Sequence, residues 1–355
     1  MVSEVNPSSF ISSSEMREKG FWRFVLEVLL VVAAMIAVIV CCDKRRVFVA
    51  DEENNHIGKK WHYLYQYAQQ KKPVDILVIG NSHAYTGLRP ELVKEMTNLN
   101  CFILAAPGVF QDDCSYMLEE ALSILKPRLV VLETYPINEY VQKELPPSQL
   151  SEQFKSFENR RNVHLKLKSM FRLFRPEDFP YAWSSTLRNH DILFDNYVLL
   201  KYNLKHPNSP EYDPEEDYWG RFISFTSGLS EETLAHYKTN GPSVDGSKIW
   251  PGPDAIYATE RMMKMCQERK IPVMFLTVPM YHEHVRNAGL WHEHLKLLIG
   301  DTPWLDLQLP IYNSYFEPDC FEDTYKENQH QTAHGANSTS ILLSRFLLKL
   351  AGIDS

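Results

Sequence analysis

The motif Gly-Asn-Ser-His occupies residues 80–83 and follows directly on VDILVI, an apolar run of strand length at residues 74–79. A serine in the turn behind a buried strand can present its hydroxyl and its own backbone N–H to one crevice, which suits a nucleophile. A serine hydroxyl alone is a weak nucleophile, so Ser82 needs a base within hydrogen-bonding reach, a group that orients this base, and donors for an oxyanion. Other parts of the chain must supply these groups.

A histidine that could serve as the base lies near the C-terminus, in the segment YKENQHQTAHGANSTSILLSRFLLKL at residues 325–350. Glu327 precedes His330 by three residues. A carboxylate and a histidine at this spacing, in a loop or first turn before a helix, can face one crevice. His330 would then accept the proton of Ser82, and Glu327 would fix the tautomer of His330 and stabilise the imidazolium. His334 is the alternative base, although the spacing fits His330 better.

Short apolar runs alternate with helix patterns around these residues. Continuous apolar runs of roughly four to eight residues suit strands that are covered on both faces. Alternating strands and helices predict a parallel sheet with helices on both faces, in which functional groups gather beyond the carboxyl ends of the strands. Ser82 stands at such an end. The predicted strands are residues 74–79, 101–105, 129–133 and 273–278, and the predicted helices are residues 90–96, 116–125 and 255–269.

The alternation breaks between residues 145 and 250, which we interpret as a partly helical insertion folded over one edge of the sheet. A solvated helix face is the simplest interpretation of its basic first part, and contact with anionic lipid headgroups or an acidic partner surface is the alternative. These basic residues are Arg160, Arg161, Lys166, Lys168, Arg172 and Arg175. The aromatic residues of the insertion either pack on the core or stack on sugars. They are Trp183, Tyr212, Tyr218, Trp219 and Trp250.

Residues 24–42, FVLEVLLVVAAMIAVIVCC, are apolar except for Glu27. With aromatic residues at one edge, the stretch approaches the ~20 residues that cross ~30 Å of hydrocarbon, which predicts one transmembrane helix over residues 21–42. The alternatives are a buried core helix and a cleaved signal peptide. The polar leader at residues 1–20 and the lack of a small-x-small site behind the apolar run favour the anchor. Basic residues balance on both sides, so charge leaves the orientation open.

The 355 residues are 44% hydrophobic and 23% charged, enough for one large α/β domain with an appendage. A net charge of −8 gives no electrostatic support for nucleic-acid binding. Neither the six cysteines nor the histidines between His282 and His294 have the spacing of metal ligands, so no metal or other cofactor is predicted. Cys101 and Cys114 either bond to each other or stay thiols.

Behind the leader and the anchor we place a connector with a first helix at 43–72, the first part of the domain at 73–144, the insertion at 145–250 and the second part at 251–355.

Several segments resemble blocks of the SGNH/GDSL hydrolase superfamily. The motif at residues 80–83 resembles the first block, and E-x-x-H-x-x-x-x-G-A at residues 327–336 is similar to the last, in which aspartate usually replaces the glutamate. Gly108, in LAAPGVF behind the second strand, matches the glycine of the second block. KPRLVVLETYPIN, at residues 126–138, is similar to the third strand of the membrane-anchored branch, which includes the D-alanyl transfer protein of teichoic-acid modification and the alginate O-acetylation proteins.

The resemblance implies a three-layer sandwich around a central parallel sheet of the flavodoxin-like type, with one N-terminal transmembrane helix and a mostly helical or irregular insertion. It also implies that the N–H groups of Ser82 and Gly108 hold the oxyanion. The third block, Gly-x-Asn-Asp, is missing, and Asn138 is the candidate for its donor. Asp323 is an alternative to Glu327 as the group that orients the histidine.

The same resemblance implies a membrane-anchored serine acyl-transfer enzyme with an extracytoplasmic domain, on the periplasmic side if the source is bacterial. It would be an O-acetyltransferase or acetylesterase that modifies a cell-surface polysaccharide through an acyl-serine. The expected partner is a multi-spanning membrane O-acyltransferase, and no cofactor is needed. The alternative is a non-catalytic scaffold of the same fold that binds polysaccharide or the membrane O-acyltransferase.

Overall fold

The structure, a computed structural model, divides into two compact units. Unit 1 comprises Met1–Ala50 and Ser184–Pro210, and unit 2 comprises Asp51–Trp183 and Glu211–Ser355. The structure describes residues 13–45, 47–48, 56–138, 153–154, 156–190, 200–201, 204, 228–323 and 330–352. The central sheet belongs to unit 2.

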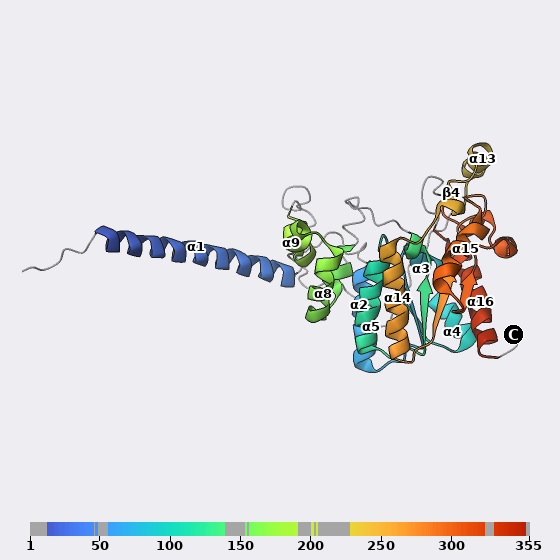
Figure 1. The fold of residues 1–355 in the computed structure, drawn as a ribbon, viewed down its shortest axis with the longest axis horizontal. Helices are drawn as coiled ribbons and strands as arrows, with labels where there is room; N and C mark the ends of the chain where they lie inside the picture. Colours follow the sequence, from blue (N-terminus) through green and yellow to red (C-terminus); the bar gives the residue numbers. More distant parts are fainter. Residues whose placement is uncertain are drawn as a thin grey trace, which may run out of the picture. The chain divides into compact units, whose positions relative to one another are not determined.

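Unit 2 is an α/β fold around a five-stranded sheet whose strands are all parallel (Figure 1). The strands are β1 (Ile76–Gly80), β2 (Cys101–Ala105), β3 (Leu129–Glu133), β5 (Val273–Thr277) and β7 (Trp304–Asp306). Their order, β2-β1-β3-β5-β7, is the doubly wound order in which the chain starts inside the sheet and extends it in both directions. The predicted α/β class with a central parallel sheet is confirmed.

Helices cover both faces of this sheet and bury a core on each side. They are α2 (His56–Gln70), α3 (Ser82–Gly87), α4 (Pro90–Thr97), α5 (Gln111–Ile124), α14 (Pro253–Glu268), α15 (Ala288–Ile299) and α16 (Ala333–Leu350). The first core joins α2, α5, α14 and α15 to one face, with Trp61 and Met262 among its residues. The second core joins α3, α4 and α16 to the other face through residues such as Val93 and Leu343. Figure 1 shows α5 and α14 side by side.

The strands form where successive residues are apolar, because both faces of the sheet are buried. Along β1, Leu77 packs into the first core and Val78 into the second. β1 pairs with both neighbours in the register Ile76↔Cys101 and Ile76↔Leu129. β2 and β3 begin and end at the predicted residues. β7 was not predicted, because its three residues are too few for a recognisable period.

The first residues of the helices show which sequence signals are enough to predict where a helix begins. α4 and α14 carry Pro90 and Pro253 in their first turns, where a proline sacrifices no hydrogen bond, and both helices lie close to the predicted ranges. α5 begins at Gln111 instead of residue 116. Its N-cap is Phe110, whose side chain makes no hydrogen bond to the helix. The sequence therefore lacks a capping residue that would indicate where α5 begins.

Unit 1 contains the long helix α1 (Ser13–Lys44). Its stretch Gly20–Lys44 has 25 residues and contains an 18-residue window with a mean hydropathy of 3.0, none of which is buried. This exposure contradicts the alternative of a buried core helix. The helix is long and apolar enough to cross a membrane, and the same properties fit a signal sequence.

The second segment of unit 1 is hydrogen-bonded to the end of α1. The Asp43 carboxylate accepts from the Thr186 N–H at 2.8 Å and from the Ser185 hydroxyl at 3.1 Å. Both residues belong to the short helix α10 (Ser185–Arg188). Unit 1 is therefore built from two segments that are far apart in the sequence.

The predicted insertion at residues 145–250 is divided between the two units. In unit 2, α8 (Val163–Leu173) packs on α5. The strand β4 (Val244–Asp245) pairs with β6 (Val285–Arg286), so the end of the insertion joins the second part of the domain. The remaining elements are α6 (Tyr135–Asn138), η2 (Pro176–Asp178), α9 (Phe179–Trp183), α13 (Glu231–Asn240), η3 (Gly246–Lys248), η4 (Pro310–Tyr315) and η5 (Pro318–Cys320). The predicted domain boundaries stay a prediction.

Candidate active site

Ser82 is the first residue of α3, two residues beyond the end of β1. The N-cap is Asn81, which is fully buried and whose Oδ1 accepts a hydrogen bond from the His83 N–H at 3.1 Å. Ser82 itself is half-buried. Because the first N–H groups of a helix have no partner within the helix, this position suits a serine whose N–H is to act on a ligand.

The turn before Ser82 depends on a close approach between β1 and β3. A Cβ on Gly80 would lie 2.6 Å from the Cβ of Glu133 and 2.9 Å from the Cβ of Ala84. Glu133 is the last residue of β3 and is buried, and its Oε1 accepts from the Tyr135 N–H at 2.7 Å. A buried carboxylate therefore lies beside the turn that carries Ser82. We did not single out this residue, although a charge that ends an apolar strand is a visible signal.

This corner is the switch point of the sheet. The chain leaves β1 through α3 and α4 on one face to reach β2, and it leaves β2 through α5 on the other face to reach β3. Ligands of open α/β sheets bind at the carboxyl ends of the strands where the order reverses in this way. Ser82 and Glu133 flank that point, one behind β1 and the other at the end of β3.

His330 reaches this corner from the C-terminal part of the chain. The ring of His83, the neighbour of Ser82, lies 5.4 Å from the ring of His330 between centroids. The His83 ring also stacks on the Tyr135 ring, with centroids 3.8 Å apart and an interplanar angle of 29°. The Nε2 atom of His330 is buried. The structure thus brings the neighbourhood of Ser82 together with His330.

The carboxylate that the structure places beside His330 is Glu322. Its Oε2 lies 3.4 Å from the Nδ1 of His330, and its N–H donates to the His330 carbonyl at 2.8 Å. A short antiparallel bridge between Phe321 and Gln331 holds the two segments opposite each other. Sequence spacing missed Glu322 because this contact depends on the chain folding back across the bridge.

The other two candidates for the orienting group differ in their positions. Glu327 lies outside the described residues. Asp323 is described, and its carboxylate accepts a hydrogen bond from the hydroxyl of Thr233 in α13, which lowers the pKa of Asp323. Asp323 is therefore engaged with α13.

His83, the neighbour of Ser82, is buried. Burial lowers its pKa well below the ordinary value, and the neighbouring His330 and His284 add to this effect. His83 is therefore a neutral imidazole. Within the described part of the chain, neither of its ring nitrogens has a hydrogen-bond partner. A buried donor and a buried acceptor thus belong to the residue that follows Ser82.

The loop behind β2 contains a glycine with a positive φ. Gly108 has a φ of +62°, in the left-handed region that favours glycine. Gly80 pairs with Ala105, so the loop of Gly108 and the turn of Ser82 leave the same edge of the sheet. Asn138 is the last residue of α6, behind β3, and its side chain lies outside what the structure describes.

A buried lysine connects three elements at the same edge. Lys60, on α2, donates from Nζ to the Ala105 carbonyl at 3.1 Å, and its Nζ lies 3.7 Å from the centre of the Tyr85 ring in α3. Burial lowers the pKa of Lys60 well below its ordinary value. Lys60 therefore ties the end of β2 to the helix that carries Ser82. No sequence pattern predicts this contact, because lysines in helices are usually exposed.

His334, the alternative base, is exposed in the first turn of α16, where its Nδ1 lies 2.7 Å from Asp319 Oδ2. With Cys320 these two residues form the group of potential metal ligands found among the described residues. Burial raises the pKa of the Cys320 thiol to about 11, which opposes the thiolate form that a metal needs. All six cysteines are free thiols, so the alternative of a Cys101–Cys114 bridge is wrong.

No family model matches the sequence, and no curated protein matches it. The function is therefore inferred from the fold and from the residues that meet at the switch point.

Proposed function

We propose that the protein is a membrane-anchored SGNH-like serine acyl-transfer enzyme. The main support is the position of His330 relative to Ser82. His330 and the neighbourhood of Ser82 come from distant parts of the chain, yet the rings of His330 and His83 lie 5.4 Å apart at the carboxyl end of β1. A histidine that has a carboxylate near its Nδ1 and a serine turn nearby is the arrangement that nucleophilic acyl transfer requires.

In the proposed reaction, the Ser82 Oγ attacks the carbonyl carbon of an acyl ester while the Nε2 of His330 accepts the hydroxyl proton. The N–H groups of Ser82 and Gly108, with Asn138 as the candidate for a third donor, hold the oxyanion. The tetrahedral intermediate then collapses, and the ester oxygen leaves with the proton from His330. Water or a second hydroxyl attacks the acyl-serine by the same steps in reverse. Glu322 stabilises the imidazolium at Nδ1, a role that the sequence had given to Glu327.

The substrate and location follow from the resemblance to the anchored branch of the superfamily. The motifs at residues 80–83 and 327–336 support an SGNH-like enzyme, and the five parallel strands in doubly wound order are consistent with it. The proposed acceptor is a cell-surface polysaccharide, modified as an O-acetyltransferase or acetylesterase would modify it. α1 would anchor the chain, with unit 2 outside the cytoplasm and a multi-spanning membrane O-acyltransferase as partner.

Hydrolysis of a chromogenic acetate ester by the full chain in lipid nanodiscs tests the proposal. Ser82→Ala should abolish turnover above background, and His330→Ala should lower kcat by ~10²- to 10⁴-fold. Matched controls are Ser123→Ala, at an exposed serine on α5, and His334→Ala, at the exposed alternative base. Both should leave the rate unchanged. Equal background rates in the wild type and in Ser82→Ala would contradict the enzyme and favour a non-catalytic scaffold.

A further inference from the structure

One face of α8 exposes a stripe of large apolar side chains. Val163, Leu167 and Phe171 are 59%, 44% and 71% exposed. They are four residues apart, so they lie on one side of the helix. An adjacent side of the helix is already packed, because Ser169 and Met170 are buried and Met170 lies in a cluster with Phe157 and other aromatic residues of unit 2. The stripe is therefore available in addition to the packing that holds α8 in place.

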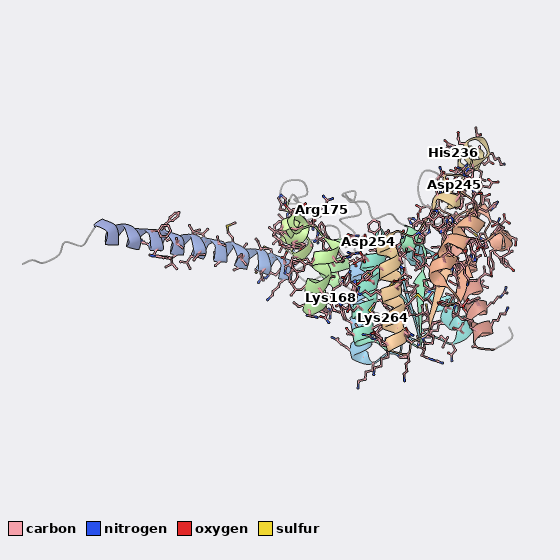
Figure 2. The ribbon with its side chains drawn as sticks, in the orientation of Figure 1. Lys168, Arg175, His236, Asp245, Asp254 and Lys264 are labelled. Carbon is pink, nitrogen blue, oxygen red and sulfur yellow. The ribbon has the colours of Figure 1, made fainter. Side chains whose placement is uncertain are left out.

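Basic residues border this stripe along its length. His164, Lys168 and Arg172 each follow a stripe residue by one position, which turns them about 100° around the helix. All three are exposed, and so is Arg175 just beyond the helix; Lys168 and Arg175 are labelled in Figure 2. The exposed face of α8 is thus apolar on one half and basic on the other. Helices that lie in the interface plane of a membrane have this division.

Acidic neighbours pair with two residues of this basic border. Lys168 pairs with Glu119 at 2.6 Å, and Arg172 pairs with Asp112 and Asp254. The side chains of both basic residues remain nearly half exposed. The apolar stripe must therefore supply most of the affinity for a bilayer, and the basic border contributes the preference for anionic lipid.

The next α-helix along the chain, α9, also exposes aromatic residues. Tyr181 and Trp183 are exposed on α9, and aromatic residues of this kind suit the headgroup level of a bilayer. Along the chain, one residue separates Trp183 from Ser185, whose hydroxyl donates to Asp43 near the end of α1. If α1 stays in the bilayer, weak affinity suffices, because a short tether gives the surface a high effective concentration of lipid.

We infer that the exposed face of α8 and α9 binds the interfacial layer of a lipid bilayer that contains anionic lipid. Val163, Leu167 and Phe171 enter the boundary between headgroups and acyl chains, while Lys168 and Arg175 face the phosphates. This inference shares the anchor with the proposed function and does not depend on catalysis by Ser82. Unit 2 would then contact the membrane directly, in addition to being linked to it through α1.

The test attaches a small fluorophore to a single cysteine in the full chain. Leu167→Cys places it on the stripe, and Leu297→Cys places it at a matched control, an exposed leucine on α15. Both variants carry Cys41→Ser and Cys42→Ser, because these thiols are not buried, whereas the other four native thiols are. The chains are reconstituted in nanodiscs of equal parts phosphatidylcholine and phosphatidylglycerol, with or without a nitroxide-labelled phospholipid.

The inference predicts that the nitroxide lipid quenches the label at residue 167 several-fold more than the label at residue 297. In phosphatidylcholine alone, the difference should become smaller. Equal quenching at the two positions would overturn the inference, and so would a blue-shifted emission at residue 167 without quenching, because protein would then cover the stripe. Alkaline carbonate extraction of the same chains shows separately whether α1 holds them in the membrane.

Discussion

At the scale of single residues, the site depends on atoms that are fixed by the backbone. The two atoms that a Cβ on Gly80 would meet at under 3 Å are the Cβ of Glu133 and the Cβ of Ala84. Neither can rotate away, so relief requires a shift of β3 or of α3, and α3 carries Ser82. Glycine at this position is therefore a requirement of the close approach and not only a turn preference.

Gly80→Ala should lower the free energy of unfolding by about 1–3 kcal/mol, the usual cost of forcing an extra methyl group into a packed site. It should also slow ester hydrolysis through the shift of Ser82. The control is Gly289→Ala, where an added Cβ meets nothing within 4 Å. Thermal unfolding of the full chain in nanodiscs, followed by near-UV circular dichroism, measures both variants. An unchanged melting temperature for Gly80→Ala would contradict the geometry.

His284 gives the protein a predictable sensitivity to acid. It is buried, its Nδ1 lies 3.0 Å from the Tyr237 hydroxyl, and burial lowers its pKa from 6.5 to about 4. The unfolded chain therefore binds the proton of this histidine more tightly than the folded chain does. Protonation of His284 does not reduce the free energy of unfolding above pH 6.5, but reduces it progressively as the pH falls from 6.5 towards 4. The loss amounts to about 3 kcal/mol, at about 1.4 kcal/mol for each pH unit.

His284→Gln should therefore reduce the difference in unfolding free energy between pH 7 and pH 4. Denaturant titration at the two pH values measures this difference. His164→Gln, at an exposed histidine, is the control and should behave as the wild type. The assignment would fail if His284→Gln were as sensitive to acid as the wild type.

At the scale of elements, a short antiparallel bridge determines which described carboxylate lies beside His330. The sequence motif does not specify this contact. The bridge between Phe321 and Gln331 sets Glu322 opposite His330, although eight positions separate the two residues. The motif E-x-x-H had pointed to Glu327. The structure adds a second carboxylate, whose contact is made across the bridge.

Glu322→Gln should lower kcat for ester hydrolysis by roughly 10²- to 10⁴-fold, because an amide cannot stabilise the imidazolium as a carboxylate does. Asp323→Asn should have little effect on kcat and should instead weaken the contact with Thr233. Stopped-flow or steady-state kinetics across a pH series distinguish the two, since only loss of the orienting group shifts the acidic limb of the profile, which reports protonation of the base. A normal rate for Glu322→Gln together with a lost rate for Glu327→Gln would transfer the role to Glu327.

The strands and helices also show how much of the fold and of the candidate site can be predicted from the sequence. β2 and β3 were predicted to the residue because each is an apolar run bounded by polar or turn residues. The position of Ser82 behind β1 followed from the same pattern. Glu133, Lys60 and Glu322 were missed because their roles depend on contacts between segments that are far apart in the chain. Their residue types are ordinary for surface positions, and only burial or pairing distinguishes them.

At the scale of the whole molecule, the apolar helix α1 bears on where the proposed reaction would take place. Its length and hydropathy fit both an anchor and a signal sequence. The absence of a small-x-small site behind it favours an anchor. Intact mass measurement of the chain extracted from expressing membranes should therefore find residues 1–20 retained. A mass that lacks the whole segment up to the end of α1 would identify a cleaved signal sequence instead.

The most direct test of the central claim is whether His330 activates Ser82. The full chain in nanodiscs is treated with a fluorophosphonate, which reacts with activated serines, and the adduct is located by mass spectrometry. If His330 activates Ser82, we expect one adduct on Ser82, no adduct at that position in Ser82→Ala, and labelling in His330→Ala that is slower by ~10²-fold or more. Labelling of Ser82 at the same rate with and without the His330 side chain would contradict this claim, and so would a wild-type chain that remains unlabelled at Ser82.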